Sequence, residues 1–177
     1  MSTTKIRRER PTRRAAPPLP SFDSLDKTHR RVLQTLVELA ELMDRLAAQG
    51  MDEAVRAQAR EICAFFDETA RSHHVAEEQV VFPSLLSSGD EELVALVRHL
   101  QQDHGWLEED WLELGPQLKA VAEGYNWYDL DALRAGIPIF ADLYRDHIAL
   151  EETMIYPEAR RREELQRAAE EQRRSAK

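Results

Sequence analysis

The sequence predicts an all-α protein, an up-down-up-down antiparallel four-helix bundle with a disordered basic N-terminal arm and a charged, helical C-terminal tail. Apolar residues recur in steps of three and four over four long segments, which is the spacing of an amphipathic helix. Turn residues separate the segments, and no alternation of apolar and polar residues predicts a strand. Because most connections are short, consecutive helices are expected to run antiparallel.

The first two helices are each expected to begin at a capping side chain. Asp23 or Ser24 caps the first helix, which ends at Gly50, and Asp52 caps the second. Pro83 has no amide hydrogen for the carbonyl four residues earlier, so we expect a kink there, followed by one further turn.

The third and fourth helices are separated by a loop at residues 125–128. Asp90 caps the third helix, and Gly115-Pro116 is expected to break it before a last turn or two. The fourth helix ends near Pro157. The highly charged segment that follows has no apolar stripe, which predicts a solvated, fraying helix.

Composition divides the chain into a basic, proline-rich arm at residues 1–21, the bundle at residues 22–160 and a charged tail at residues 161–177. The net charge is −9 although the arm is basic, so the bundle is acidic, which argues against a nucleic-acid groove. The single cysteine, Cys63, rules out an internal disulfide and is expected to be an inert buried thiol. No apolar run approaches the roughly 18 residues needed to span a bilayer, so we expect a soluble, cytoplasmic protein whose tails are the candidate contacts for a protein partner.

One pattern, His-x3-Glu-x4-aromatic-Pro, occurs twice. Its members are His73, Glu77, Phe82 and Pro83 in the first copy and His147, Glu151, Tyr156 and Pro157 in the second. A step of four residues places the histidine and the glutamate on one face of a helix, one turn apart. The chain therefore resembles two similar helical hairpins, each of which supplies one histidine and one His-x3-Glu pair.

The inward stripes of the four helices contain six residues of types that bind metals: His29, His73, Glu77, His104, His147 and Glu151. Burying an unpaired carboxylate costs on the order of several kcal/mol, and the stripes contain no Lys or Arg, so cations from solution are the remaining partner. These ligands are too many for one tetrahedral zinc ion and suit two ions of the iron or manganese type, bridged by Glu77 and Glu151. Two divalent ions outweigh two carboxylates in charge, which leaves room for an oxo or hydroxo bridge.

His74 and Glu78 repeat the same spacing one residue later. Because one residue turns an α-helix by about 100°, we expect only one of the two pairs to face inward, and the apolar stripe selects His73 and Glu77.

Three residues remain candidates for an extra ligand or for a hydrogen bond to the site: Glu108, His74 and Tyr144. Glu108 could bind metal, bond a ligand histidine or face solvent. Tyr144 is either a core aromatic residue or a donor to an iron-bound oxygen species.

On these motifs, residues 22–160 resemble the hemerythrin-like family, also called the HHE cation-binding domain. The resemblance implies a four-helix bundle with a non-haem di-iron centre that interacts with oxygen, nitric oxide or peroxide. It favours iron over manganese or zinc, with His29, His73, His104 and His147 as ligands and Glu77 and Glu151 as bridges.

Two departures from the oxygen-carrying members are visible. Those members place His-x3-His on the third helix and end with His-x4-Asp, whereas this chain has Glu108 and Glu151 at the corresponding points. The set of four histidines and two glutamates is closer to the metal domain of bacterial iron-centre repair and nitric-oxide-response proteins. Those proteins usually carry a cysteine-bearing N-terminal domain that has no counterpart in this sequence. Actinobacterial hemerythrin-like proteins that decompose peroxide are a third comparison.

Three functions fit this ligand set. The first is a module that binds or senses oxygen or nitric oxide, and the second is an enzyme acting on peroxide or nitric oxide. The third is a metal store or a metal-binding bundle without turnover.

Overall fold

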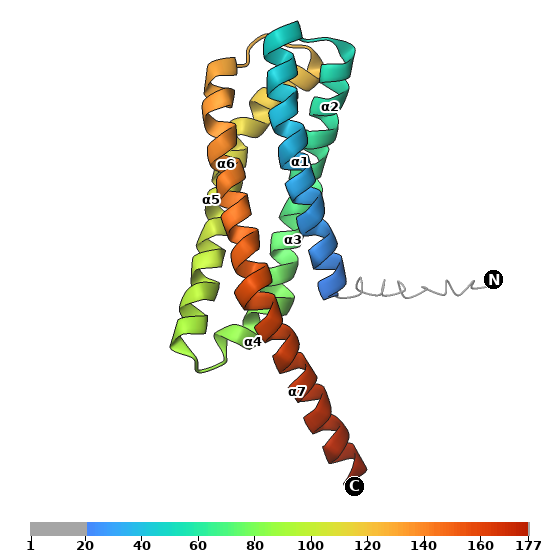
Figure 1. Ribbon diagram of the computed structural model, residues 1–177, viewed down its shortest axis with the longest axis vertical. Helices are drawn as coiled ribbons and strands as arrows, with labels where there is room; N and C mark the ends of the chain where they lie inside the picture. The colour runs from blue at the N-terminus through green and yellow to red at the C-terminus, as the bar shows by residue number, and fades with distance from the viewer. Residues whose placement is uncertain (1–20, 177) are drawn as a thin grey trace, which may run out of the picture.

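The computed structural model describes residues 21–176, so the arm expected to be disordered lies almost wholly outside the described residues. Within that range the regular structure is entirely helical (Figure 1). Four long helical rods account for it: α1 (Phe22–Gln49); α2 (Glu53–Ala64), η1 (Phe65–Ala70), α3 (Arg71–Ala76), η2 (Glu77–Val81) and α4 (Phe82–Leu86); α5 (Glu91–Glu123); and α6 (Leu130–Leu150), η3 (Glu151–Ile155) and α7 (Tyr156–Ser175). The predicted four-helix bundle is confirmed.

The rods form a ring in which each packs against its neighbours in sequence. α1 contacts α2 and α6, and α5 contacts the same two helices from the other side. Short connections reverse the chain between successive rods, which gives the up-down-up-down order (Figure 1). Among the described residues, no helix combines the length and apolar character that crossing a bilayer requires.

Capping side chains fix where the rods begin. Asp52 and Asp90 accept from backbone amides of α2 and α5, as the sequence predicts. Asp129 caps α6 by accepting from two backbone amides at 3.0 Å. The expected cap of α1 is wrong by two or three residues, because the Ser21 hydroxyl accepts from the amide of Ser24 instead.

The expected break at Gly115-Pro116 is also wrong, since α5 continues through both residues to Glu123. Proline deprives the carbonyl of Leu112 of its donor, but Leu112 is 74% exposed, so water can replace that donor. Gly115 lies against Trp111, where a Cβ atom would come within 3.0 Å of the indole. The glycine therefore serves close packing rather than a turn.

Three π-helical segments interrupt the second and fourth rods. Glu77 begins η2 and Glu151 begins η3, and the carbonyl of each accepts from the amide five residues later. Pro83 and Pro157 are the second residues of α4 and α7, so one aromatic residue separates each from the π-helical segment before it. The wider turn accommodates the missing proline donor without ending the helix, and the extra turn after Pro83 extends to Leu86 as expected.

A polar layer divides the bundle core into two apolar clusters. One cluster includes Val32 and Leu107, and the other includes Leu25 and Leu100. Between the two clusters the buried residue of α1 is His29, and the buried residues of α5 are Asp103 and His104. The six predicted site residues therefore lie in a layer with apolar packing on both sides.

Candidate metal centre

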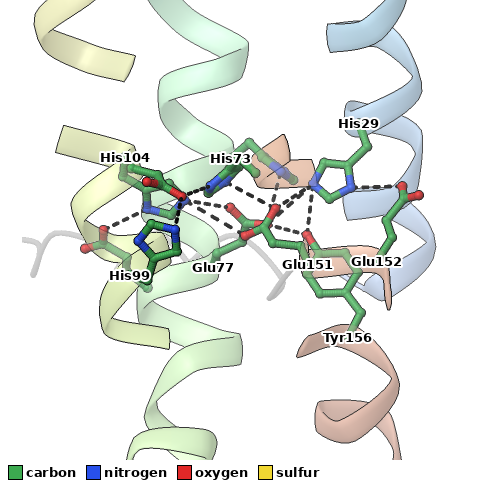
Figure 2. Close-up of polar contacts among 11 residues, drawn as sticks. His29, His73, Glu77, His99, His104, Glu151, Glu152 and Tyr156 are labelled. Carbon is green, nitrogen blue, oxygen red and sulfur yellow. Dashed lines mark hydrogen bonds and ion pairs between the residues drawn. The ribbon is translucent and has the colours of Figure 1, made fainter. Parts of the chain in front are cut away.

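The six residues selected from the sequence meet in the polar layer, and all six are buried. They are His29 of α1, His73 of α3, Glu77 of η2, His104 of α5, His147 of α6 and Glu151 of η3. Figure 2 shows the histidines from three different rods converging on the two carboxylates. Both glutamates have no exposed surface.

Each histidine directs a ring nitrogen to at least one of these carboxylates. His29 Nε2 lies 3.1 Å from Glu151 Oε2 and 3.6 Å from Glu77 Oε1. His73 Nε2 lies 3.1 Å from Glu77 Oε1, and His104 Nε2 lies 3.4 Å from Glu77 Oε2. His147 Nε2 lies 3.3 Å from Glu151 Oε2.

The contacts resolve into two sets of four side chains. One set is His29, His73, Glu77 and Glu151, and the other is Glu77, His104, His147 and Glu151. In each set the candidate ligand atoms all lie within 4.8 Å of one another. Glu77 and Glu151 belong to both sets, so each carboxylate lies between the two pairs of histidines.

Several of these atoms have no hydrogen-bond partner among residues 21–176. They include both ring nitrogens of His73 and His147, His104 Nε2, Glu77 Oε2 and both carboxylate oxygens of Glu151. A buried polar atom left unpaired costs about 1–3 kcal/mol. A cluster of such atoms, made of imidazole nitrogens and carboxylate oxygens, matches the donor set of a transition-metal site.

Protonation has to balance the buried charges when no ion does so. Burial raises the pKa of Glu151 to about 8, and the neighbouring Glu77 carboxylate adds to the effect. Burial opposes ionisation of His29 as well, but Glu151 and Glu77 raise its pKa to about 10. Burial would also raise the pKa of Glu77, but the nearby imidazoles of His104, His29 and His73 hold it well below its usual range.

Carboxylates also approach the outer nitrogen of three of the histidines. His29 Nδ1 lies 3.1 Å from Glu152 Oε1, and His104 Nδ1 lies 2.9 Å from Glu78 Oε1. His147 Nδ1 lies 3.6 Å from the buried Asp103. For His29 and His104, which are within hydrogen-bond distance of their partners, such a carboxylate fixes the tautomer in which Nε2 keeps its lone pair for a metal.

Tyr156 belongs to the site, although the sequence pattern identified it only as the aromatic residue before Pro157. Its hydroxyl donates to Glu77 Oε1 and lies 3.2 Å from His29 Nε2 (Figure 2). Burial, with the Glu77 and Glu151 charges, raises the pKa of the phenol, so it stays a neutral donor. The sequence did distinguish this residue, because the first copy of the repeat has Phe82 where the second has Tyr156 with its hydroxyl group.

The expectation that only one His-x3-Glu pair faces inward is wrong for His74. Both adjacent histidines are buried, His73 against the ring of His29 at 4.7 Å and His74 against that of His104 at 4.1 Å. Their rod is enclosed by α1 on one side and α5 on the other, so an arc wider than 100° is covered. Burial, with His104 nearby, lowers the pKa of His74 well below its usual value.

The two other ambiguous residues differ in exposure. Glu108 is exposed, with its carboxylate 4.0 Å from Arg71, and it makes no contact with the two sets. Tyr144 is buried among aromatic rings, 5.0 Å from Phe140 and 5.8 Å from His74 between centroids. Tyr144 is therefore placed as a core aromatic residue.

An all-α bundle with two overlapping histidine-glutamate sets in its core defines a class of metal-binding helical proteins. The profile of the hemerythrin HHE cation-binding domain matches residues 21–159. The chain belongs to this family.

A protein of Haemophilus influenzae, described as uncharacterized, is similar to this chain. The two are 30% identical over 133 residues, which is 75% of each sequence. No solved structure matches the chain.

Proposed function

We propose that the chain holds two iron ions bridged by Glu77 and Glu151, and that this centre binds or senses oxygen or nitric oxide. The observation that carries the proposal is that two sets of buried ligands have both glutamates in common. One ion needs only one set of ligands. Two neighbouring ions need ligands that can bind both of them, as Glu77 and Glu151 can. Iron is preferred because the chain belongs to the hemerythrin family, and because carboxylate-bridged pairs of iron ions are held in this way inside helical bundles, whereas manganese favours oxygen donors over imidazole.

In this proposal His29 and His73 hold one ion, and His104 and His147 hold the other. Bound iron supplies the redox chemistry and the affinity for small gases that side chains lack. The chain's own part is to orient the imidazoles through the outer carboxylates and to exclude water. The apolar clusters on both sides of the layer support that exclusion.

A second candidate is an enzyme that acts on peroxide or nitric oxide. It is favoured by a pocket of about 210 Å³ whose lining runs from the exposed Leu112 and Arg71 to the buried His74 and Tyr144. This pocket gives a small molecule a path from solvent toward the layer. Stopped-flow mixing of the reduced, iron-loaded protein with oxygen, nitric oxide and peroxide separates reversible spectral change from continued consumption.

Metal analysis tests the shared centre directly. Protein expressed in iron-replete medium is expected to carry about two irons per chain, with near-ultraviolet charge-transfer absorption. Glu77→Ala and Glu151→Ala are each expected to lose much of the iron, because both sets lose a ligand. Glu109→Ala, an exposed carboxylate on α5, is the matched control. A folded, colourless protein without metal would overturn the proposal.

A further inference from the structure

His74 is buried beside the proposed centre, yet the two sets do not include it. Its side chain is 3% exposed, and neither ring nitrogen has a hydrogen-bond partner in the described part of the chain. A histidine that serves only as a core residue normally pairs at least one nitrogen. The nearest phenol, that of Tyr144, makes no hydrogen bond to it, although the rings lie 5.8 Å apart.

The ring nitrogens of His74 belong to a third cluster of candidate ligand atoms. His74, His104 and His147 each offer a nitrogen within 4.8 Å of the other two. The ring of His74 lies 5.7 Å from that of His147 and nearly parallel to that of His104. His104 and His147 are the two histidines of one of the shared sets.

We propose that His74 is a third imidazole ligand of the ion held by His104 and His147. This inference rests on the proposed two-ion centre. It gives the two ions different numbers of imidazole ligands. His29 and His73 hold one ion with two imidazoles, whereas the other ion receives three.

The stacked arrangement of His74 differs from a ligating one in the orientation of its ring. Two imidazoles stacked face to face cannot both direct a lone pair at one ion, so the His74 ring has to turn out of its stack on His104. The torsion about the Cβ–Cγ bond of histidine is broad, which makes this turn inexpensive. His74 also lines the pocket that contains Tyr144, so there is space on that side.

Cobalt titration of the full-length, metal-free chain tests the inference. His74→Phe keeps an aromatic ring against His104 but removes both nitrogens, and circular dichroism checks that the variant folds. Trp127→Phe changes an exposed aromatic residue in the loop at residues 125–128 and is the control. Wild-type protein is expected to take up about two Co²⁺, and His74→Phe to bind one normally and the other at least roughly tenfold more weakly.

A second readout counts ligands independently of affinity. Each imidazole bound to Co²⁺ gives a shifted exchangeable N–H signal in the proton NMR spectrum, and His74→Phe is expected to lose one such signal. Added imidazole is expected to restore the weakened Co²⁺ site in His74→Ala, because it can fill the position of the missing ring.

Two results would overturn the inference while leaving the shared centre intact. One is His74→Phe with both affinities and all N–H signals unchanged. The other is equal weakening of both Co²⁺ sites, which would indicate a packing role. Wild-type protein that binds no Co²⁺ would instead remove the two-ion centre itself, so the two failures are distinguishable.

Discussion

Tyr156 joins the candidate centre to the last helix through one hydroxyl group. This hydroxyl donates to Glu77 and approaches His29, so a residue of the fourth rod contacts ligands from the first and second. A hydrogen bond to a charged acceptor contributes roughly 1.5–3 kcal/mol to stability. The phenol therefore helps to hold Glu77 in position.

Replacing Tyr156 with Phe tests that role. The free energy of unfolding of the metal-free protein is expected to fall by roughly 1.5–3 kcal/mol in chemical denaturation, because the buried carboxylate loses its donor. Iron content is expected to stay at the wild-type level. Tyr125→Phe, at a tyrosine that is 53% exposed, is the control. Loss of iron in Tyr156→Phe would contradict this expectation and show that metal binding also needs the phenol.

Burial is expected to make the Cys63 thiol unreactive. The thiol is 5% exposed, and burial raises its pKa to about 12. We expect no reaction with Ellman's reagent at pH 8 in the folded protein, and one thiol per chain after denaturation. Because the folded pKa exceeds the ordinary 9.0, the free energy of unfolding should fall as the pH rises from 9.0 toward 12. Rapid labelling of native protein would contradict this.

At the scale of the element, the repeated sequence pattern is a repeated helix distortion. Glu77 and Glu151 each begin a π-helical segment, and a proline follows each segment by one residue. The spacing His-x3-Glu is the same in a regular helix, so the pattern predicted the shared face without revealing the wider turn. Segments of this kind occur often at functional sites.

The cap of α6 provides a prediction at this scale. Asp129 accepts from the amides of Asp131 and Ala132, and its helix carries His147. Asp129→Ala is expected to lower the free energy of unfolding by about 0.5–2 kcal/mol. Urea denaturation measures the change, with Asp146→Ala on an exposed face of the same helix as control. Equal effects of the two substitutions would contradict a capping role.

At the scale of the whole molecule, the polar layer separates two apolar clusters, and bound ions are expected to stabilise the fold there. Each ion present at 100 times its dissociation constant adds about 2.7 kcal/mol to stability. Removing both with a chelator is therefore expected to lower Tm by on the order of 10 °C, measured by calorimetry. Re-addition of iron should restore Tm, and an unchanged Tm after complete removal would contradict the coupling.

The bundle was predictable because helix periodicity and caps such as Asp52 and Asp90 are local signals. The grouping of six side chains was predictable because each lies on an inward stripe. Burial of His74 was not, since it depends on α1 and α5 enclosing its helix from both sides. Asp103 was also missed, because its partner His147 is distant in sequence and no local spacing connects them.

The C-terminal helix α7 extends beyond the bundle and begins at the candidate centre. α7 contains 20 residues, so it is a rod of about 30 Å whose outer part projects past the bundle, while its first residue is Tyr156 (Figure 1). A continuous helix transmits tilt and translation along its length. A molecule bound at the outer end would therefore be connected, through one continuous helix, to the hydroxyl that contacts Glu77 and His29.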